Sequence, residues 1–231
     1  MEQLPLGVRL RTSSTFGTFH AGDNGALVTA LRARALQSGL SPAWLWGATG
    51  AGRTHLLQAT CALVGEHGAA SAYLPLGAEW LAPGMLAGLE QLAVVCLDDV
   101  DSVAGRADWE RALFVLYNEL GERGGRLVCA ARGAPATLPI LLPDLASRLA
   151  ASLVWQVRPL PEDAVPAALQ ALAAALGLEL PDETLQYLLR RLPRGFAELC
   201  EVLDRLDGAA LARQRRLTVP FVRSVLEPAD G

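Results

Sequence analysis

The chain has 231 residues, of which 52% are hydrophobic and 19% are charged, and its formal net charge is −4. This length allows one mid-sized domain with a buried core and a smaller second domain. The acidic balance argues against a protein that binds nucleic acid through bulk electrostatic attraction. All 20 basic residues are arginines, so an arginine at any single position is less informative than usual.

The cysteines and the lack of long apolar segments indicate the cellular setting. The four cysteines lie far apart within apolar segments, which favours buried thiols over disulfides or a metal site. They are Cys61, Cys96, Cys129 and Cys200. The N-terminus has no basic region followed by an apolar run, and no segment reaches about 18 uninterrupted apolar residues. We therefore expect a soluble, cytoplasmic protein with no membrane partner.

The N-terminal residues 1–15 contain proline, glycine and a hydroxyl cluster without a helical period, which predicts a tail. Its leucines and Val8 alternate with other residues, a pattern that suits an edge strand or an extended peptide docked on a partner. A tail folded back on its own domain is the alternative. A helix is expected next, over residues 25–37, with Asp23 or Asn24 as its cap.

Residues 44–57 read as a short apolar strand, a glycine-rich turn and the start of a helix. The turn fits a phosphate-binding P-loop with Gly47, Gly52 and Thr54 in place, except that Arg53 stands where the pattern has lysine. Glycines let backbone N–H groups wrap a phosphate, and the helix N-terminus faces the anion. A guanidinium is wider than an ammonium and aims its donors differently. We therefore expect the loop to bind phosphate, whereas the positioning of the γ-phosphate for catalysis is in question. A turn without a ligand is the alternative.

Further apolar runs predict four more strands that alternate with helices. The strands are expected at 71–76, 93–100, 126–131 and 153–157, and the helices at 79–91, 108–123 and 142–149, the first being weak and interrupted by Pro83. Alternating strands and helices imply right-handed crossovers and a parallel sheet. The sequence therefore predicts an α/β fold with a parallel five-stranded sheet and helices on both faces.

The pattern changes to purely helical near residues 159–161. Helices are expected at 162–176, 181–192, 194–206 and 218–226. Leucines recur on one face of the second and third of these helices, which predicts a small helical bundle. We therefore expect a tail over 1–15, an α/β domain over 16–160 and a helical domain over 161–231.

A pair of carboxylates ends the second predicted strand after the P-loop. Asp98 lies about 45 residues beyond the P-loop, where a magnesium-binding Walker B aspartate belongs. Thr54 and Asp98 would hold Mg²⁺, and Asp99 would orient a water. The alternative is that both aspartates only cap the next helix.

Together, the P-loop, the Asp98-Asp99 pair and the C-terminal helices resemble an AAA+ nucleotide-binding module of the DnaA type. Three segments, 50–55, 142–149 and 217–222, are closer still to the Hda family of DnaA regulatory inactivators. The resemblance implies an AAA+ fold with a helical lid, and ADP or ATP with Mg²⁺ as cofactors. It places residues 16–24 beside the adenine. The implied nucleotide-binding residues are Gly22, Asn24, Gly47, Gly50, Ala51, Gly52, Arg53, Thr54, His55 and Arg194.

The Hda resemblance also implies partners and a role. Such a protein restrains replication initiation: held at the sliding clamp, the beta subunit of DNA polymerase III, it stimulates ATP hydrolysis by DnaA. The N-terminal Gln3, Leu4 and Leu6 resemble the clamp-binding peptide, although proline and the lack of a terminal aromatic residue depart from it. DNA would then be contacted indirectly, and self-association stays open. Arg148 would act as an arginine finger in trans on DnaA, unless it only pairs with Asp144.

Departures from the AAA+ pattern weaken the chain's own hydrolysis. Residues 129–132 read Cys-Ala-Ala-Arg where a polar sensor I residue is usual, and Ala197 takes the position of the sensor II arginine, with Arg194 as a substitute one turn earlier. The intact Asp98 and Asp99 favour a second possibility, an AAA+ ATPase such as a helicase loader. A DNA-binding truncated initiator is a third, disfavoured by the acidic balance.

Overall fold

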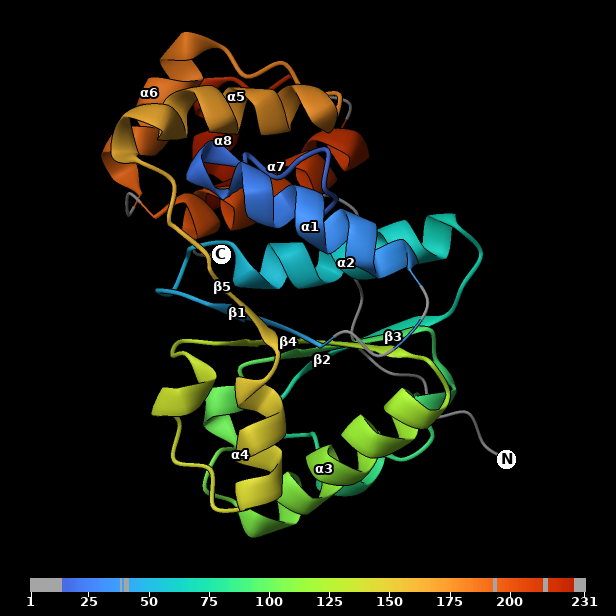
Figure 1. Cartoon of the computed structure of the whole chain (residues 1–231). Helices are drawn as coiled ribbons and strands as arrows, with labels where there is room; N and C mark the ends of the chain where they lie inside the picture. The colour runs from blue at the N-terminus through green and yellow to red at the C-terminus, as the bar shows by residue number, and fades with distance from the viewer. Residues whose placement is uncertain (1–13, 38, 40–41, 193–194, 214–215, 227–231) are drawn as a thin grey trace. The chain divides into compact units, whose positions relative to one another are not determined.

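A computed structural model describes residues 14–37, 39, 42–192, 195–213 and 216–226. The chain divides into two compact units, Met1–Pro159 and Leu160–Gly231. We call them the α/β unit and the lid unit and describe each by itself. Figure 1 shows the elements of both units along the chain.

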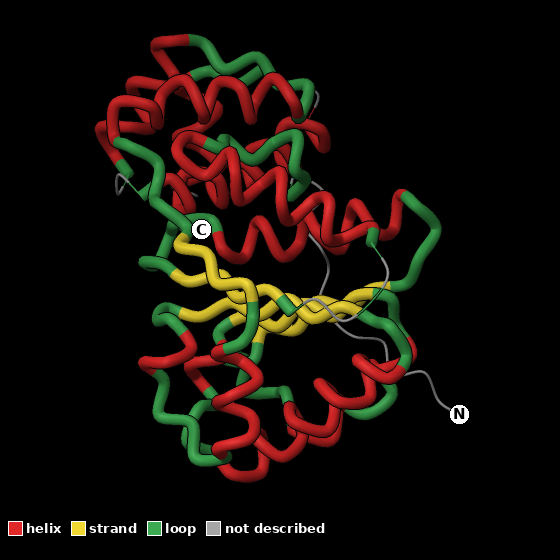
Figure 2. Tube along the Cα trace, viewed as in Figure 1, coloured by secondary structure: helices red, strands yellow, loops and turns green. Residues whose placement is uncertain are grey.

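The α/β unit is built on one parallel sheet. Its strands are β1 (Ala43–Trp46), β2 (Ser71–Pro75), β3 (Val94–Asp98), β4 (Arg126–Ala131) and β5 (Leu153–Gln156). They lie in the order β2-β3-β4-β1-β5, and every neighbouring pair is parallel. Figure 2 shows the strands as a single twisted layer between helices. The predicted α/β fold with five parallel strands is confirmed.

Helices cover both faces of this sheet. Helices α1 (Gly25–Leu36) and α2 (Arg53–Glu66) lie on one face, and α3 (Ala107–Glu122) and α4 (Pro143–Ala150) lie on the other (Figure 1). Successive strand residues point to opposite faces, so Trp44 packs into the core on the α3 and α4 side while Leu45 packs on the α1 and α2 side. Both side chains are fully buried, as expected for a sheet covered by helices.

The strand register brings three chain segments together at the carboxyl edge of the sheet. Trp46 of β1 pairs with Ala131 of β4, and Leu97 of β3 pairs with Cys129 of β4. Because the strands are parallel, the residues that follow β1, β3 and β4 emerge at the same edge. In α/β folds this edge is where ligands bind, at the point where the strand order reverses.

Three local predictions were wrong. The expected helix over 79–91 is two short 3-10 helices, η2 (Pro83–Leu86) and η3 (Leu89–Gln91). The first ends because Ala87 takes an extended backbone, and Gly88, with a φ of 90°, precedes the second. Helix α7 (Phe196–Arg213) runs about two turns past the expected end at residue 206. Asn24 occupies the N-cap position of α1, but neither it nor Asp23 makes a side-chain capping bond.

The lid unit is a bundle of short helices. These are η6 (Glu162–Ala164), α5 (Val165–Ala175), α6 (Asp182–Arg191), α7 and α8 (Val219–Leu226). The expected stripes form its core, where Leu185, Leu188, Leu199 and Leu203 are all buried. The Thr184 hydroxyl is buried and donates to the Leu217 carbonyl at 2.9 Å, which ties α6 to the segment before α8. Within the described residues of either unit, no helix has the length and apolar character needed to cross a membrane.

Candidate nucleotide-binding site

The P-loop takes a backbone that favours glycine at three positions. A Cβ atom at Gly47 would lie 2.4 Å from the Val157 carbonyl oxygen, and one at Gly52 would lie 2.7 Å from the Phe19 ring. Gly50 and Gly52 also have φ values of 80° and 100°, in the left-handed region. The loop therefore folds back tightly between β1 and α2, so that the first N–H groups of α2 face the carboxyl edge of the sheet.

Arg53, the first residue of α2, holds a buried charge next to this loop. The residue is only 8% exposed, and its Nη1 atom is buried without a hydrogen-bond partner among the described residues. Leaving a charged donor buried and unpaired is costly. An anion of the size of a phosphate would satisfy it, so the residues present fit a phosphate-bearing ligand.

Asp98 is the buried end of β3 and is held by three donors. The hydroxyl groups of Thr54 and Tyr73 donate to its Oδ2 atom at 2.6 Å and 3.0 Å, and the Asp99 N–H donates to Oδ1 at 3.0 Å. Burial and the charge of Asp98 raise the pKa of Tyr73 far above its ordinary value, so Tyr73 stays a donor. The Thr54 and Asp98 oxygens lie together and are of the kind that Mg²⁺ prefers.

Asp99 has an unusual backbone and environment. In the described part of the chain it is the one non-glycine residue with a positive φ, at 51°, and such conformations often mark functional sites. Burial, and then the negative charge of Asp98, raise the pKa of Asp99 above its ordinary value, while Arg53 and Arg132 lower it. Asp99 therefore lies within electrostatic reach of arginines from α2 and from the end of β4.

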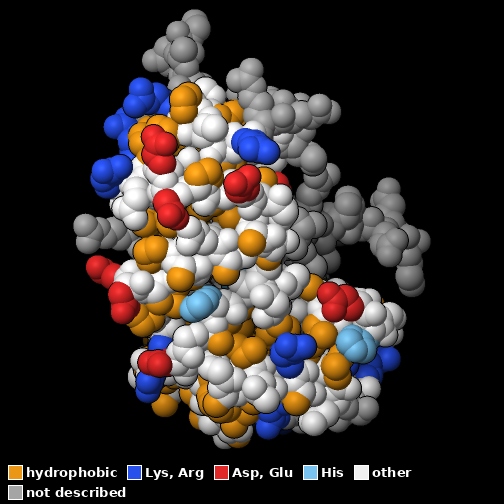
Figure 3. Space-filling view, turned by 90° about the horizontal axis from the view of Figure 1, so that it is seen from above, with side chains coloured by type: hydrophobic (Ala, Val, Ile, Leu, Met, Phe, Trp, Pro, Cys, Tyr) orange, Lys and Arg blue, Asp and Glu red, His pale blue; other side chains and the backbone are white. Residues whose placement is uncertain are grey.

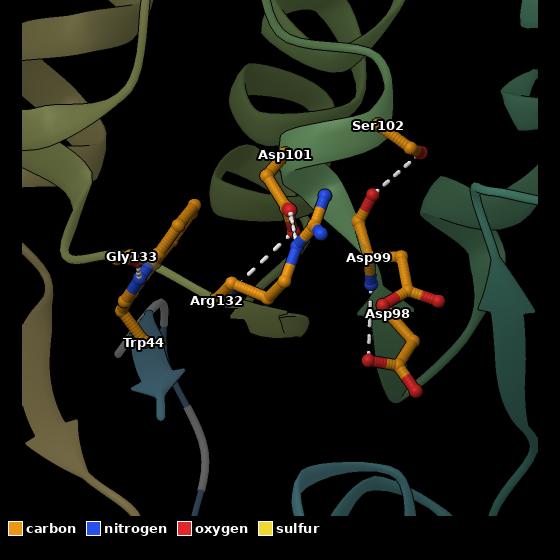
Figure 4. Close-up of polar contacts among 7 residues, drawn as sticks. All are labelled: Trp44, Asp98, Asp99, Asp101, Ser102, Arg132 and Gly133. Carbon is orange, nitrogen blue, oxygen red and sulfur yellow. Dashed lines mark hydrogen bonds and ion pairs between the residues drawn. The ribbon is translucent and has the colours of Figure 1, made fainter. Parts of the chain in front are cut away.

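Arg132 and Asp101 complete this edge, and the sequence did not reveal their pairing (Figure 4). The Arg132 side chain donates from Nε to Asp101 Oδ2 at 2.6 Å, and its backbone N–H donates to Oδ1 at 3.2 Å. Burial alone would raise the pKa of Asp101, but the hydrogen bonds and charge of Arg132 lower it below its ordinary value. The two residues lie 31 positions apart, so no local pattern connects them.

The predicted adenine-side segment lies against the P-loop, but its polar side chains have protein partners. The Asn24 amide donates to the Arg158 carbonyl and accepts from the Arg158 N–H, both at 2.9 Å. His55 Nε2 lies 2.8 Å from the Thr15 carbonyl oxygen, and the His55 ring packs on Phe19 at 5.3 Å between centroids. These side chains therefore hold the segment in place, and Gly22 lies exposed beside them.

Arg148 lies on α4, away from the P-loop edge. Its guanidinium carbon stands 5.0 Å from the centroid of the Phe114 ring and 5.3 Å from that of Tyr117, both on α3. The residue is exposed. Among the ion pairs of the described residues there is none between Arg148 and Asp144. Stacking on two rings restrains the side chain while its N–H edge stays open to solvent.

Glu110 positions the start of α4, a role that its sequence context does not signal. The side chain is 2% exposed. It accepts hydrogen bonds from the N–H groups of Gly105 at 2.8 Å and Leu142 at 2.8 Å, and from Leu141 at 2.9 Å. Gly105 lies just before α3, whereas Leu141 and Leu142 directly precede α4. A carboxylate on α3 therefore binds the N–H groups at the start of α4 from outside that helix and complements its dipole.

The structure thus brings together Gly47, Gly50, Ala51, Gly52, Arg53, Thr54, Asp98 and Asp99 at one edge of the sheet. Ala197 lies in the first turn of α7 and carries no charge. The predicted clamp-binding residues Gln3, Leu4 and Leu6, and also Arg194, fall outside the described residues. No cluster of three or more His, Cys, Asp or Glu side chains suited to a metal occurs in the described chain. The four cysteines are free thiols, of which Cys61, Cys96 and Cys129 are buried as expected and Cys200 is only partly buried.

Solved structures of similar fold belong to the DnaA and RuvB proteins. Domain III of the Thermotoga maritima replication initiation protein DnaA matches with a TM-score of 0.72 and 21% identity, over 96% of this chain and 98% of that one. AMPPCP-bound DnaA from Aquifex aeolicus matches with a TM-score of 0.66 and 20% identity, over 90% and 71%. The Thermotoga maritima RuvB branch migration motor matches with a TM-score of 0.57 and 16% identity, over 91% and 69%. These similarities confirm the AAA+ fold.

The lid unit gives a more specific match. Residues 162–226 match the family model of the Hda lid domain. This range runs from the start of η6 to the end of α8, so it spans every helix of the unit. The chain therefore has a DnaA-like AAA+ fold, and its C-terminal unit matches the Hda lid domain.

Proposed function

We propose that this chain is a negative regulator of DNA replication initiation that stimulates ATP hydrolysis by DnaA while bound to the DNA-loaded sliding clamp, the beta subunit of DNA polymerase III. The observation that carries the proposal is an Hda lid domain joined to a DnaA-like AAA+ fold. The fold allows assembly against a similar AAA+ module, which leaves a second copy of this chain as a further partner. Its setting would be the cytoplasm.

The first part of the proposal is that the α/β unit binds ADP or ATP. The left-handed glycines and the open donors at the start of α2 form a cradle for phosphate, and Arg53 carries the unpaired buried donor described above. Thr54 and Asp98 would hold Mg²⁺, which when bound neutralises charge on the phosphates. The AMPPCP-bound DnaA of similar fold supports an adenine nucleotide as the ligand.

The second part is that the chain's own hydrolysis is slow. Ala130 and Ala131, which end β4 beside β3, are fully buried and offer no polar group to an attacking water. Ala197 supplies no charge from α7, and Arg53 replaces the lysine that normally contacts the β- and γ-phosphates. Asp99 remains as the residue that orients water. Binding is thus retained, whereas stabilisation of the transition state is reduced.

The third part assigns Arg148 as an arginine finger that acts on nucleotide bound to DnaA. The side chain is exposed, restrained by Phe114 and Tyr117, and carried by a helix whose start is fixed by Glu110. Such a group is preorganised, because little conformational freedom is lost when it meets a phosphate. A guanidinium can bridge two phosphate oxygens as charge redistributes in the transition state.

Clamp binding is assigned to Gln3, Leu4 and Leu6. Their alternating apolar pattern suits an extended peptide in an apolar pocket. Acidic and basic side chains are interspersed on the face drawn in Figure 3, and the net charge is −4, which supports contact with DNA through the clamp. Deleting residues 1–8 should abolish retention on a clamp column without changing the melting temperature. Full retention of the truncated chain would remove this assignment.

The experiment that tests the function reconstitutes the reaction. DnaA loaded with ATP is mixed with clamp on DNA, and release of phosphate is followed with and without this chain. The proposal predicts accelerated hydrolysis that requires both the chain and the loaded clamp. Hydrolysis at the same rate in all mixtures would contradict it.

A helicase loader that uses its own ATP is the second candidate. It is favoured by the hydrogen-bonded Thr54 and Asp98 pair, which preserves the metal side of an ATPase site. The two candidates differ in turnover of the isolated chain. Robust hydrolysis by this chain alone, abolished by Asp99→Ala, would favour the loader over the regulator.

A further inference from the structure

A tyrosine from the neighbouring strand holds the Asp98 carboxylate. Tyr73 of β2 is paired with Cys96 of β3, and Asp98 ends β3 two residues further along. Residues two apart on a strand point to the same face of the sheet, and Tyr73 and Cys96 belong to the core on the α1 and α2 side. The Tyr73 hydroxyl therefore meets Asp98 under α2 and donates to its Oδ2 atom at 3.0 Å.

Helix α2 completes this contact with two side chains. Thr54 and Gln58 lie four residues apart, so they share one face of the helix. The Thr54 hydroxyl donates to the same Asp98 Oδ2 atom at 2.6 Å, and the Gln58 side chain hydrogen-bonds the Tyr73 hydroxyl. The four side chains form one continuous network that joins α2 to strands β2 and β3.

The network is buried and fixes the orientation of the carboxylate. Tyr73, Gln58 and Asp98 are all buried. Two hydroxyl groups donate to Oδ2 of Asp98, and the Asp99 N–H donates to Oδ1 at 3.0 Å (Figure 4). A carboxylate with donors on both oxygens cannot turn without breaking buried hydrogen bonds, which is costly.

The fixed carboxylate in turn orients the Thr54 hydroxyl. Because Thr54 gives its hydrogen to Asp98, the lone pairs of its oxygen are left for another partner. Thr54 is the second residue of α2, directly after the glycine-rich turn, and oxygen ligands are the kind that Mg²⁺ prefers. The orientation of Thr54 thus depends on Asp98, and that of Asp98 depends on Tyr73.

We propose that Tyr73 is a positioning residue for Mg²⁺ in the candidate nucleotide site, and that it acts by holding Asp98 rather than by touching nucleotide or metal. Loss of such an outer hydrogen bond commonly lowers metal affinity by about 10- to 100-fold. The inference rests on the nucleotide-binding part of the proposed function, in which Thr54 and Asp98 hold the metal. The alternative is that Tyr73 only compensates the burial of Asp98.

The test is calorimetric titration of the full chain with ADP, in EDTA and at a series of Mg²⁺ concentrations. Tyr73→Phe removes the hydroxyl and keeps the ring. The variant should need about tenfold more Mg²⁺ than wild type for the same gain in ADP affinity, whereas its affinity for ADP in EDTA should change by less than about twofold. Equal losses with and without Mg²⁺, or no loss in either, would overturn the inference.

Thr60→Val is the matched control for loss of a buried hydroxyl. Thr60 also lies on α2, and its hydroxyl donates to the Leu56 carbonyl oxygen of the same helix at 2.7 Å. The variant should keep the wild-type Mg²⁺ dependence even where its melting temperature falls. The same change of Mg²⁺ dependence in both variants would show that it comes from a loosened fold, and Tyr73 would lose its assignment.

A double variant shows whether Tyr73 acts through Asp98. Asp98→Asn removes the charge of the carboxylate and should itself abolish most of the gain from Mg²⁺. Adding Tyr73→Phe should then change the Mg²⁺ dependence no further, because the two residues act as one unit. A further loss as large as that of Tyr73→Phe alone would mean that Tyr73 acts independently of Asp98, which contradicts the inference.

The titrations also separate this inference from the wider proposal. They need neither DnaA nor the clamp, so failure to stimulate DnaA would leave it standing. If Mg²⁺ strengthens ADP binding equally in wild type and Tyr73→Phe, only the assignment of Tyr73 fails. If the wild-type chain binds no ADP, or binds it without any effect of Mg²⁺, this inference fails together with the nucleotide or metal part of the proposed function.

Discussion

Among the described residues, the α/β unit contains seven of the eight buried polar or charged side chains, and the lid unit contains only Thr184. The α/β unit is only about twice as long, so length does not explain the difference. Three of these side chains have places of particular interest: Arg53 starts α2 after the P-loop, Asp98 ends β3, and Glu110 binds the start of α4. Each such group is costly to bury unless it is paired, so their concentration in this unit agrees with the candidate nucleotide-binding site placed there.

The lid unit buries almost only apolar side chains, yet it is the unit that matches a family model. Its core is a set of leucines and other apolar residues that pack helices α5 to α8 together, and residues 162–226 are the range that matches the Hda lid domain. The match to a family model thus lies in one unit, whereas the candidate nucleotide-binding residues lie in the other. Substitutions should separate accordingly into effects on chemistry and effects on stability.

The largest effect on chemistry is expected for Arg148→Ala. Removing the proposed finger should lower the stimulated rate of DnaA hydrolysis by about 10³ to 10⁵. Unfolding and nucleotide binding should stay unchanged, because the side chain is exposed and stacks on the Phe114 and Tyr117 rings. Phosphate release in the clamp-on-DNA mixture measures it. Asp144→Ala on the same helix is the matched control and should behave like wild type. Full stimulation by Arg148→Ala would remove the finger assignment.

The largest effect on stability is expected for Leu203→Ala in α7. Leu203 is fully buried in the lid core, so truncation should lower the free energy of unfolding by about 2–5 kcal/mol through lost burial and a cavity. Chemical denaturation with guanidinium measures it. Val202→Ala, on the partly buried side of the same helix, should cost clearly less. Equal costs for the two variants would show that the lid core is not packed as described.

Gly52→Ala joins the two kinds of effect at one position. An alanine at this position would have to adopt a φ of 100° and would meet the Phe19 ring, which should lower the free energy of unfolding by about 1–3 kcal/mol. The resulting shift of the P-loop should also weaken ADP binding. Gly65→Ala, on the same helix with open space around it, should instead stabilise the fold by about 0.5–1 kcal/mol. Thermal unfolding and ADP titration of both variants measure this contrast. Similar behaviour of the two would show that the P-loop backbone is not constrained.

The smallest effect concerns the pH dependence of the Asp101–Arg132 pair. The pKa of Asp101 is lowered in the folded chain, so the ionised carboxylate adds stability above its unfolded pKa of about 3.9, and this stability is lost as the pH falls through the folded pKa. Asp101→Asn should therefore cost about 0.2–1 kcal/mol at neutral pH and progressively less below about pH 4.

This difference is measured by the free energy of unfolding of wild type and Asp101→Asn across about pH 2–7, a range that spans the carboxyl pKa. Asp108→Asn is the control, because Asp108 meets Arg106 only at 3.8 Å between two exposed side chains, and its cost should be smaller. If the stability cost of Asp101→Asn grows as the pH falls, the pKa of Asp101 is not lowered by folding and the prediction is wrong.

The sequence predicted what depends on local patterns. The apolar run 126–131 coincides with β4, and the spacing of glycines located the P-loop, because both signals lie within a few residues. Contacts between distant segments left no such trace: Glu110 reaches the start of α4 from 31 residues away, and Asn24 bonds to Arg158 across 134 positions. The sequence predicted Asn24 as a helix cap because its side-chain amide can either cap a helix or bond to a distant backbone group. Only the fold shows that it does the second.

The claim that the α/β unit is a nucleotide-binding unit is tested most directly by titrating ADP into the wild-type chain and into Arg53→Ala. Arg53 Nη1 is one of two buried side-chain donors without a partner among the described residues, the other being Trp109 Nε1. The account predicts saturable binding of one ADP per wild-type chain, weakened about tenfold or more in Arg53→Ala, with no loss of thermal stability in the variant. Absence of saturable binding to the wild type, or equal affinities of the two proteins, would contradict it.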